Sequence, residues 1–156
     1  AMADIKKIEA LRFDRTSDVL GKTKATVTQI KGGTQHNVIP DECLYVVDVR
    51  TNEQYSNDEV ADMLNDLIEG TLMPRSTRLN SSKMPLDHPV AQGASSLGIP
   101  MIGSPTLSDQ ALMRFPTVKM GPGDSPRSHT ADEYIYLSEI EDGIDAYIDL
   151  LKAIEI

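Results

Sequence analysis

The fold is decided by residues 43–70, "CLYVVDVRTNEQYSNDEVADMLNDLIEG", which predict a strand followed by a helix. The first eight residues are rich in β-branched and aromatic side chains, as strands are. Alternation along a strand separates them into two faces. One face carries Leu44, Val46, Asp48 and Arg50, and the other carries Cys43, Tyr45, Val47 and Val49.

The helix is predicted over residues 56–70. Ser56 and Glu59 have the spacing of a capping box, and Gly70 is the expected stop. The apolar side chains recur at helical spacing and form one stripe. Its members are Val60, Met63, Leu64, Leu67 and Ile68.

Three further elements surround this pair. Residues 3–13 predict a helix without a capping side chain at its start, and residues 24–30 predict a strand. Residues 72–82 predict a further strand, placed at a sheet edge because of Pro74. The order helix, strand, strand, helix, strand is most of a ferredoxin-like βαββαβ unit that lacks its first strand.

The connection "GGTQHNVIPDE", residues 32–42, is longer than a hairpin requires. Asn37 within it either satisfies its own backbone in an irregular turn or offers its amide to a ligand. Arg50, at the end of the following strand, shares a face with Asp48. Those two side chains predict either a plain ion pair or a guanidinium that receives a ligand carboxylate.

The second half has a different pattern. Residues 88–98 predict a short helix, and residues 99–105 and 115–123 predict short buried strands. A final helix is expected to be capped at Ser138, with Glu141 completing the box. Its buried face would carry Ile140, Ile144, Tyr147, Ile148 and Leu151.

Ser108 and Asp109, in "GSPTLSDQALM" (residues 103–113), are predicted to lie where a loop enters a helix. Residues of this kind at such a position either cap the helix or bond to a substrate or to groups around a site.

Charge divides the chain near residue 83. Residues 1–83 contain 11 Lys and Arg against 13 Asp and Glu, whereas residues 84–156 contain 4 against 11. The overall net charge of −9 argues against nucleic acid and anionic membrane surfaces as partners. We therefore expect two domains, residues 1–83 and 84–156.

The sequence contains no apolar run that approaches the roughly 18 residues of a membrane span. Its single cysteine, Cys43, cannot form an intrachain disulfide, and we expect a buried thiol in a reducing cytoplasm.

His129 follows a loop rich in Gly, Pro and Ser, "GPGDSPRSHTADEYI" (residues 121–135). It is either a surface histidine or a residue displayed by a site loop. A catalytic zinc takes three protein ligands, yet His36 and His88 lie far away in sequence. Because the sequence has no H-x-D, H-E-x-x-H or C-x-x-C pairing, these residues alone predict no metal site.

Residues 32–60, 103–113 and 121–135 together resemble the acetylornithine deacetylase / succinyl-diaminopimelate desuccinylase family of dinuclear zinc amidohydrolases. The motifs are "GGTQHNVIPDECLYVVDVRTNEQYSNDEV", "GSPTLSDQALM" and "GPGDSPRSHTADEYI", and their order and spacing both match. The resemblance implies an α/β zinc-peptidase-like catalytic domain interrupted by a ferredoxin-like lid that also dimerises. Residues 1–83 would be that lid without its first strand, and residues 84–156 the C-terminal segment of the catalytic domain.

The same resemblance implies roles for individual residues. His129 matches the last histidine ligand of the zinc pair. Asn37 and Arg50 match lid positions that reach the substrate, in the partner subunit's site, and Ser108 and Asp109 match a segment that lines the substrate pocket. The remaining ligands and the glutamate base of the family are expected before residue 1, so no catalytic residue is assigned within this sequence.

We expect a C-terminal fragment of a zinc-dependent N-acyl-amino-acid deacylase that hydrolyses N-acyl-ornithine in arginine biosynthesis, inactive as an isolated chain. The family uses two zinc ions, with cobalt also possible, and the lid predicts a homodimer. Whether the acyl group is acetyl or succinyl stays open. The alternatives are a non-enzymatic dimerisation module and a related dinuclear zinc dipeptidase.

Overall fold

The computed structural model describes residues 1–154, which form two compact units. The first unit combines Ala1–Ser82 with Gly103–Arg114, and the second combines Lys83–Ile102 with the chain from Phe115 onward. The first unit thus takes in a segment that the sequence division at residue 83 assigns to the other half.

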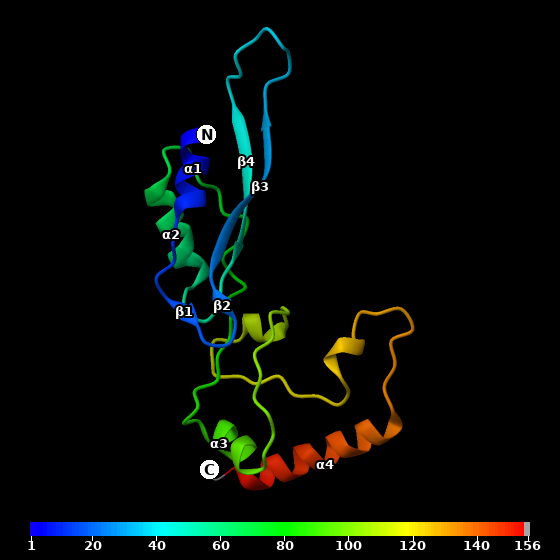
Figure 1. Cartoon of the computed structure of the whole chain (residues 1–156). Helices are drawn as coiled ribbons and strands as arrows, with labels where there is room; N and C mark the ends of the chain where they lie inside the picture. The colour runs from blue at the N-terminus through cyan, green and yellow to red at the C-terminus, as the bar shows by residue number, and fades with distance from the viewer. Residues whose placement is uncertain (155–156) are drawn as a thin grey trace. The chain divides into compact units, whose positions relative to one another are not determined.

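The first unit is built on two long antiparallel strands with two helices against one face (Figure 1). The strands pair from Lys24↔Arg50 to Gly32↔Cys43, and a bulge interrupts the ladder between Val27 and Gln29. A small hairpin that the sequence did not predict precedes them. The elements are α1 (Met2–Ala10), β1 (Thr16–Ser17), β2 (Gly21–Lys22), β3 (Lys24–Gly32), β4 (Cys43–Arg50) and α2 (Asn57–Leu67).

The core of this unit confirms the alternation predicted for β4. Tyr45, Val47 and Val49 pack against the core, whereas Leu44 and Val46 on the other face are each 51 % exposed. The buried residues of the core are Ile8, Phe13, Tyr55, Val60 and Leu64. The predicted α/β class is therefore correct, with the apolar stripe of α2 facing the inner side of the sheet.

Cys43 departs from its prediction, because its side chain is exposed. It is the first residue of β4 and pairs with Gly32 at the end of the ribbon, beyond the two helices (Figure 1). No helix covers the inner face of the sheet at that end, so alternation alone does not bury the thiol.

Helix α2 begins as predicted and ends earlier. The Ser56 hydroxyl accepts a hydrogen bond from the Glu59 N–H at 3.1 Å, while the Glu59 carboxylate pairs with Arg15. The helix ends at Leu67, so the prediction that Gly70 stops it was wrong. The Gly70 N–H instead donates to a carboxylate of α1, at 3.2 Å.

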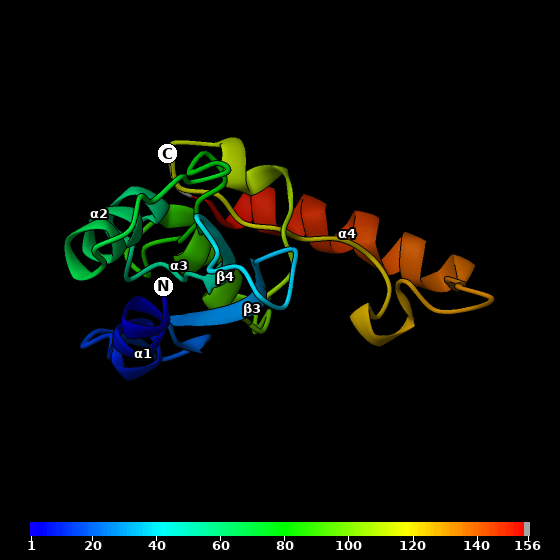
Figure 2. The same cartoon turned by 90° about the horizontal axis from the view of Figure 1, so that it is seen from above.

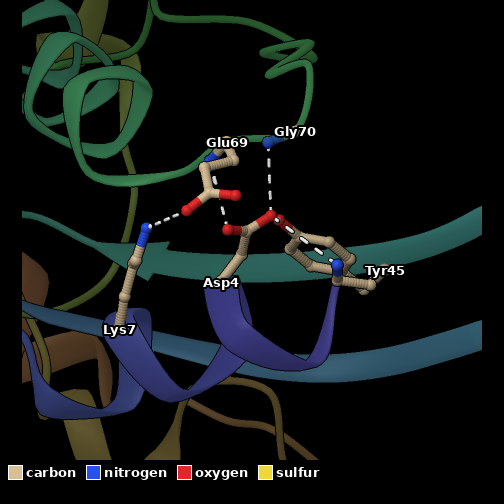
Figure 3. Close-up of polar contacts among 6 residues, drawn as sticks. Asp4, Lys7, Tyr45, Glu69 and Gly70 are labelled. Carbon is tan, nitrogen blue, oxygen red and sulfur yellow. Dashed lines mark hydrogen bonds and ion pairs between the residues drawn. The ribbon is translucent and has the colours of Figure 1, made fainter.

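That carboxylate belongs to Asp4, whose residue surface is 3 % exposed (Figure 3). It accepts hydrogen bonds from the Glu69 N–H at 3.1 Å, from the Gly70 N–H, and from the Tyr45 hydroxyl at 3.5 Å. Beside it, Lys7 Nζ lies 2.9 Å from Glu69 Oε1. The Glu69 backbone bond, above all, lowers the pKa of Asp4 despite its burial.

The predicted edge strand is absent from residues 72–82, all of which the structure describes. The start of α2 holds this segment instead. The Asn57 side-chain amide donates to the Leu79 carbonyl at 2.7 Å, and the Asn57 N–H donates to Asn80 Oδ1 at 2.7 Å. A strand requires a neighbouring strand for its ladder, and this segment is bonded to side chains at a helix end.

The second unit contains α3 (Pro89–Ser96), α4 (Leu137–Ala153) and irregular chain that includes the 3₁₀ turn η2 (Ser125–Arg127). The predicted helix over residues 88–98 is confirmed, with His88 Nδ1 accepting from the Val90 N–H at 3.3 Å. The strands predicted at residues 99–105 and 115–123 were wrong. These residues make no ladder, and Ile102 and Phe115 are 82 % and 65 % exposed.

The cap position of helix α4 is Tyr136, two residues before the predicted cap. The Tyr136 N–H donates to Glu139 Oε2 at 2.9 Å, so Glu139 takes the part that was predicted for Glu141, while no side-chain bond from Tyr136 replaces the predicted serine cap. The predicted apolar stripe exists, but it is exposed, and the prediction of a buried face was wrong. Only Leu150 of α4 is buried in this structure, close to Gly93 of α3.

No helix in residues 1–154 is long and apolar enough to cross a membrane.

Candidate functional site

The hairpin end of the first unit carries the predicted ligand loop. Residues 33–42 connect β3 to β4, which confirms the long connection. A hollow of about 510 Å³ opens there, lined among others by Lys31, Thr34, Val38, Ile39, Asp41 and Glu42. Asn37 is exposed in the same loop but is not one of the residues that line the hollow.

Arg50 lies at the other end of β4 from that loop. Its Nε donates to Asp48 Oδ2 at 2.8 Å, so the ion pair that the sequence left open is present. The Arg50 side chain is nevertheless 78 % exposed. Seven strand steps separate the two ends of β4, or roughly 24 Å at the usual rise per residue. One copy of the chain therefore does not bring Asn37 and Arg50 together.

Ser108 and Asp109 lie at the start of a short 3₁₀ helix, η1 (Asp109–Leu112), which confirms the predicted junction. Ser108 occupies the cap position, but its hydroxyl donates to the Gln110 side chain at 3.1 Å and makes no cap bond to the backbone. The segment approaches the β1–β2 turn so closely that a Cβ on Gly103 would lie 2.1 Å from Val19 Cγ1.

His129 is exposed and adopts a left-handed backbone conformation, with φ of 61°. Its N–H donates to Glu133 Oε2 at 3.0 Å. One residue later, the Thr130 hydroxyl donates back to the Arg127 carbonyl at 2.7 Å. Asp132 in the same loop also has a positive φ, of 57°. The histidine is thus displayed by a tightly folded loop.

The described residues do not by themselves form a metal centre. Within residues 1–154 no three or more His, Cys, Asp or Glu side chains are grouped as metal ligands would be. Glu133, the carboxylate beside His129, is engaged by the histidine's own backbone N–H. A catalytic zinc requires three protein ligands, so His129 in this chain supplies one at most, and no reaction step is derived through a metal here.

The sequence prediction missed Arg127, which organises the same loop. Its guanidinium lies 5.0 Å from the Tyr134 ring centroid and 5.4 Å from that of Tyr136, and it pairs with the Glu139 carboxylate. This ion pair lowers the pKa of Glu139 and raises that of Arg127. The sequence "YIY", residues 134–136, could have indicated a paired aromatic surface, because alternation in an extended segment places Tyr134 and Tyr136 on one side.

A family model described as the peptidase dimerisation domain of the M20 family matches residues 1–75. A search of curated proteins found no match. The matched region contains α1, both long strands and α2, which is the helix, strand, strand, helix order of a ferredoxin-like lid. Residues 1–75 are therefore similar to an M20 peptidase dimerisation domain, and this match supports the M20 peptidase family for the chain.

Proposed function

We propose that the chain is part of a zinc-dependent amidohydrolase that removes the acyl group from an N-acyl amino acid, N-acyl-ornithine being the expected substrate. The observation that carries the proposal is the dimerisation domain at residues 1–75. The motifs of residues 103–113 and 121–135 follow it in the order that the deacylase resemblance requires. A cytoplasmic location and a role in arginine biosynthesis belong to the same proposal.

In this proposal His129 is a zinc ligand, and Arg50 and Asn37 contact the substrate. The Arg50 guanidinium is exposed and held at one nitrogen by Asp48, so it suits a carboxylate that arrives from solvent. Asn37 and Arg50 lie at opposite ends of β4. They would therefore contact opposite ends of one substrate, or contact two substrates bound in separate sites. Ser108 and Asp109 would line the substrate pocket.

A zinc titration by calorimetry tests the metal ligand. We expect weak binding, with a dissociation constant of about 1 mM, lost in His129→Ala and kept in His36→Ala, because one imidazole holds zinc poorly. Weak binding that is unaffected by His129→Ala would remove His129 as a ligand. Tight stoichiometric binding by the chain would contradict the reading that it supplies a single ligand.

A titration with N-acetyl-ornithine, followed by NMR, tests the substrate class. We expect shifts at the amides of Arg50 and Asn37 that saturate in the millimolar range, as for a partial site. Arg50→Ala should weaken binding about tenfold, the equivalent of one charge-assisted bond, and the exposed Arg75→Ala should not. Equal binding by all three proteins, or shifts that ornithine itself reproduces, would contradict the proposal.

The second candidate function is a dimerisation module without enzymatic activity. It is favoured by the identity of the matched region, which is the dimerisation domain itself. It predicts a dimer that shows no shift with N-acyl amino acids, so the same titration separates the two candidates.

A further inference from the structure

Two cationic side chains face each other across one end of the β3–β4 ribbon. The register pairs Lys24 with Arg50, and side chains directly opposite in an antiparallel pair lie on the same face. Both helices of the unit lie on one side of the ribbon (Figures 1 and 2), and the neighbouring pair, Ala25 and Val49, packs against the core on that side. Lys24 and Arg50 therefore lie on the outer face, where both are exposed.

This pair breaks the rule that governs facing side chains. Like charges directly opposite one another destabilise a sheet, whereas opposite charges stabilise it. Asp48, the diagonal neighbour of Lys24, is bonded to Arg50 Nε at 2.8 Å instead. Within residues 1–154, neither Lys24 nor the two terminal nitrogens of Arg50 have an ion pair or a hydrogen bond. Because sequences break such rules chiefly at functional sites, the pair points to a ligand.

A third cation, Lys22, lies on the same side. Thr23, between the two lysines, is 4 % exposed, so alternation in the extended chain turns Lys22 and Lys24 away from the core. The buried side-chain amide of Asn52 donates to the Gly21 carbonyl at 2.7 Å, which ties this segment to the chain that follows β4. The end of the ribbon thus presents three cations on a fixed backbone, in a chain whose net charge is −9.

The segment of residues 103–113, which the resemblance places in the substrate pocket, begins at the same end. A Cβ added to Gly103 would lie 2.1 Å from Cγ1 of Val19, in the turn between β1 and β2. Because β2 leads directly into β3, this contact lies at the ribbon end that carries Arg50. The loop of residues 33–42 is at the other end.

We propose that Lys24 and Arg50 together bind a carboxylate group, received between the Lys24 ammonium and the terminal nitrogens of Arg50. The Arg50–Asp48 pair carries no net charge, so Arg50 alone would attract an arriving carboxylate weakly. Lys24 supplies the charge that this pair lacks. The proposal rests on the proposed function in one respect, namely that the ligand is an N-acyl amino acid. Lys24 is then a substrate-binding residue.

Lys24→Gln separates this role from a structural one, because it should affect folding and binding in opposite directions. Removing one of two facing like charges should raise the urea midpoint. In an NMR titration of the full chain, the same variant should bind N-acetyl-ornithine about tenfold more weakly. Lys24→Arg keeps the charge and should bind within about twofold of the wild type. Lys6→Gln, which removes the same charge from an exposed position on α1, should leave binding unchanged.

A double-mutant cycle tests whether both cations hold one carboxylate. In the Arg50→Ala background, Lys24→Gln should weaken binding by only about threefold, because the carboxylate is no longer held between two cations. N-acetylputrescine, which is N-acetyl-ornithine without its carboxylate, should bind equally weakly to the wild type and to Lys24→Gln. Full tenfold losses that simply multiply in the double variant would contradict a shared carboxylate.

The outcomes distinguish this proposal from the proposed function. Unchanged binding of N-acetyl-ornithine by Lys24→Gln, with Arg50→Ala still weakened, would overturn the role of Lys24 and leave the proposed function standing. Succinate is the second probe. If only succinate shifts the Arg50 amide, and less so in Lys24→Gln, the carboxylate site stands and the substrate class fails. No shift at Arg50 with either probe would overturn the site.

Discussion

At the scale of single residues, the contacts that matter most join positions far apart in sequence. Asp4 accepts the N–H groups of Glu69 and Gly70, 65 and 66 positions later. Its position in the first turn of a helix suggests only a favourable interaction with the helix dipole. The sequence does not show which distant backbone groups a carboxylate will meet, so this role could only come from the structure.

Replacing Asp4 with Asn should make the first unit less stable at pH 7 and less sensitive to acid. The folded-state pKa of Asp4 is lowered, so its stabilisation is fully present above the unfolded value of about 3.9. It is lost as the pH falls through the folded-state pKa. Urea denaturation at pH 7 and near pH 2 should show Asp4→Asn less stable than the wild type at pH 7, with the two converging in acid.

The exposed Asp62→Asn is the control for this prediction, because it removes the same charge from α2. It should leave the stability at both pH values within about 0.5 kcal/mol of the wild type. A deficit in Asp4→Asn that stayed constant between pH 7 and acid would mean that the carboxylate charge is not what Glu69 and Gly70 require.

At the scale of elements, helices were predicted better than strands. Residues 24–30 and 43–50 were correctly predicted as strands, and they are the two that pair with each other. Residues 72–82, 99–105 and 115–123 have apolar or β-branched residues but form no ladder. Composition describes the side chains of a single segment. Whether that segment forms a strand depends on a neighbouring strand to pair with, which no local pattern reveals.

The cap of α2 should contribute about 1 kcal/mol to the free energy of unfolding, since the Ser56 hydroxyl satisfies the Glu59 N–H. Ser56→Ala should lower the urea midpoint accordingly, and Ser81→Ala, in an exposed position, should not. Equal midpoints for Ser56→Ala and the wild type would show that the N–H finds another acceptor.

Leu64 and Leu44 provide a matched test of which faces are buried. Leu64 on α2 is 3 % exposed, whereas Leu44 on the outer face of β4 is 51 % exposed. Leu64→Ala should cost about 2–5 kcal/mol of unfolding free energy, and Leu44→Ala less than about 0.5 kcal/mol. Similar losses from both substitutions would indicate that the outer face of the sheet is also covered.

At the scale of the whole molecule, the chain combines a region that matches a dimerisation domain with a second unit that exposes much apolar surface. The stripe predicted on α4 is present, and Ile144 and Leu151 on it are 56 % and 68 % exposed. A helix face of this kind is normally covered. The sequence predicted the stripe through its periodicity, but periodicity does not identify what covers it.

The residues of the candidate site divide in the same way. Motif resemblance indicated Asn37, Arg50, Ser108, Asp109 and His129, and the structure adds where each one lies. The resemblance could not indicate Arg127, because a loop arginine becomes informative only when the structure shows Tyr134, Tyr136 and Glu139 around it.

The oligomeric state in solution tests the central claim most directly, namely that residues 1–83 make a homodimer. Light scattering on the full chain should give about 34 kDa, twice the 17.1 kDa of one copy. The double variant Ile144→Glu, Ile148→Glu should give the same mass if the dimer forms, as we propose, through the first unit and not through the stripe of α4. A mass of 17.1 kDa for the wild type at every concentration, or a dimer lost in the double variant, would contradict the account.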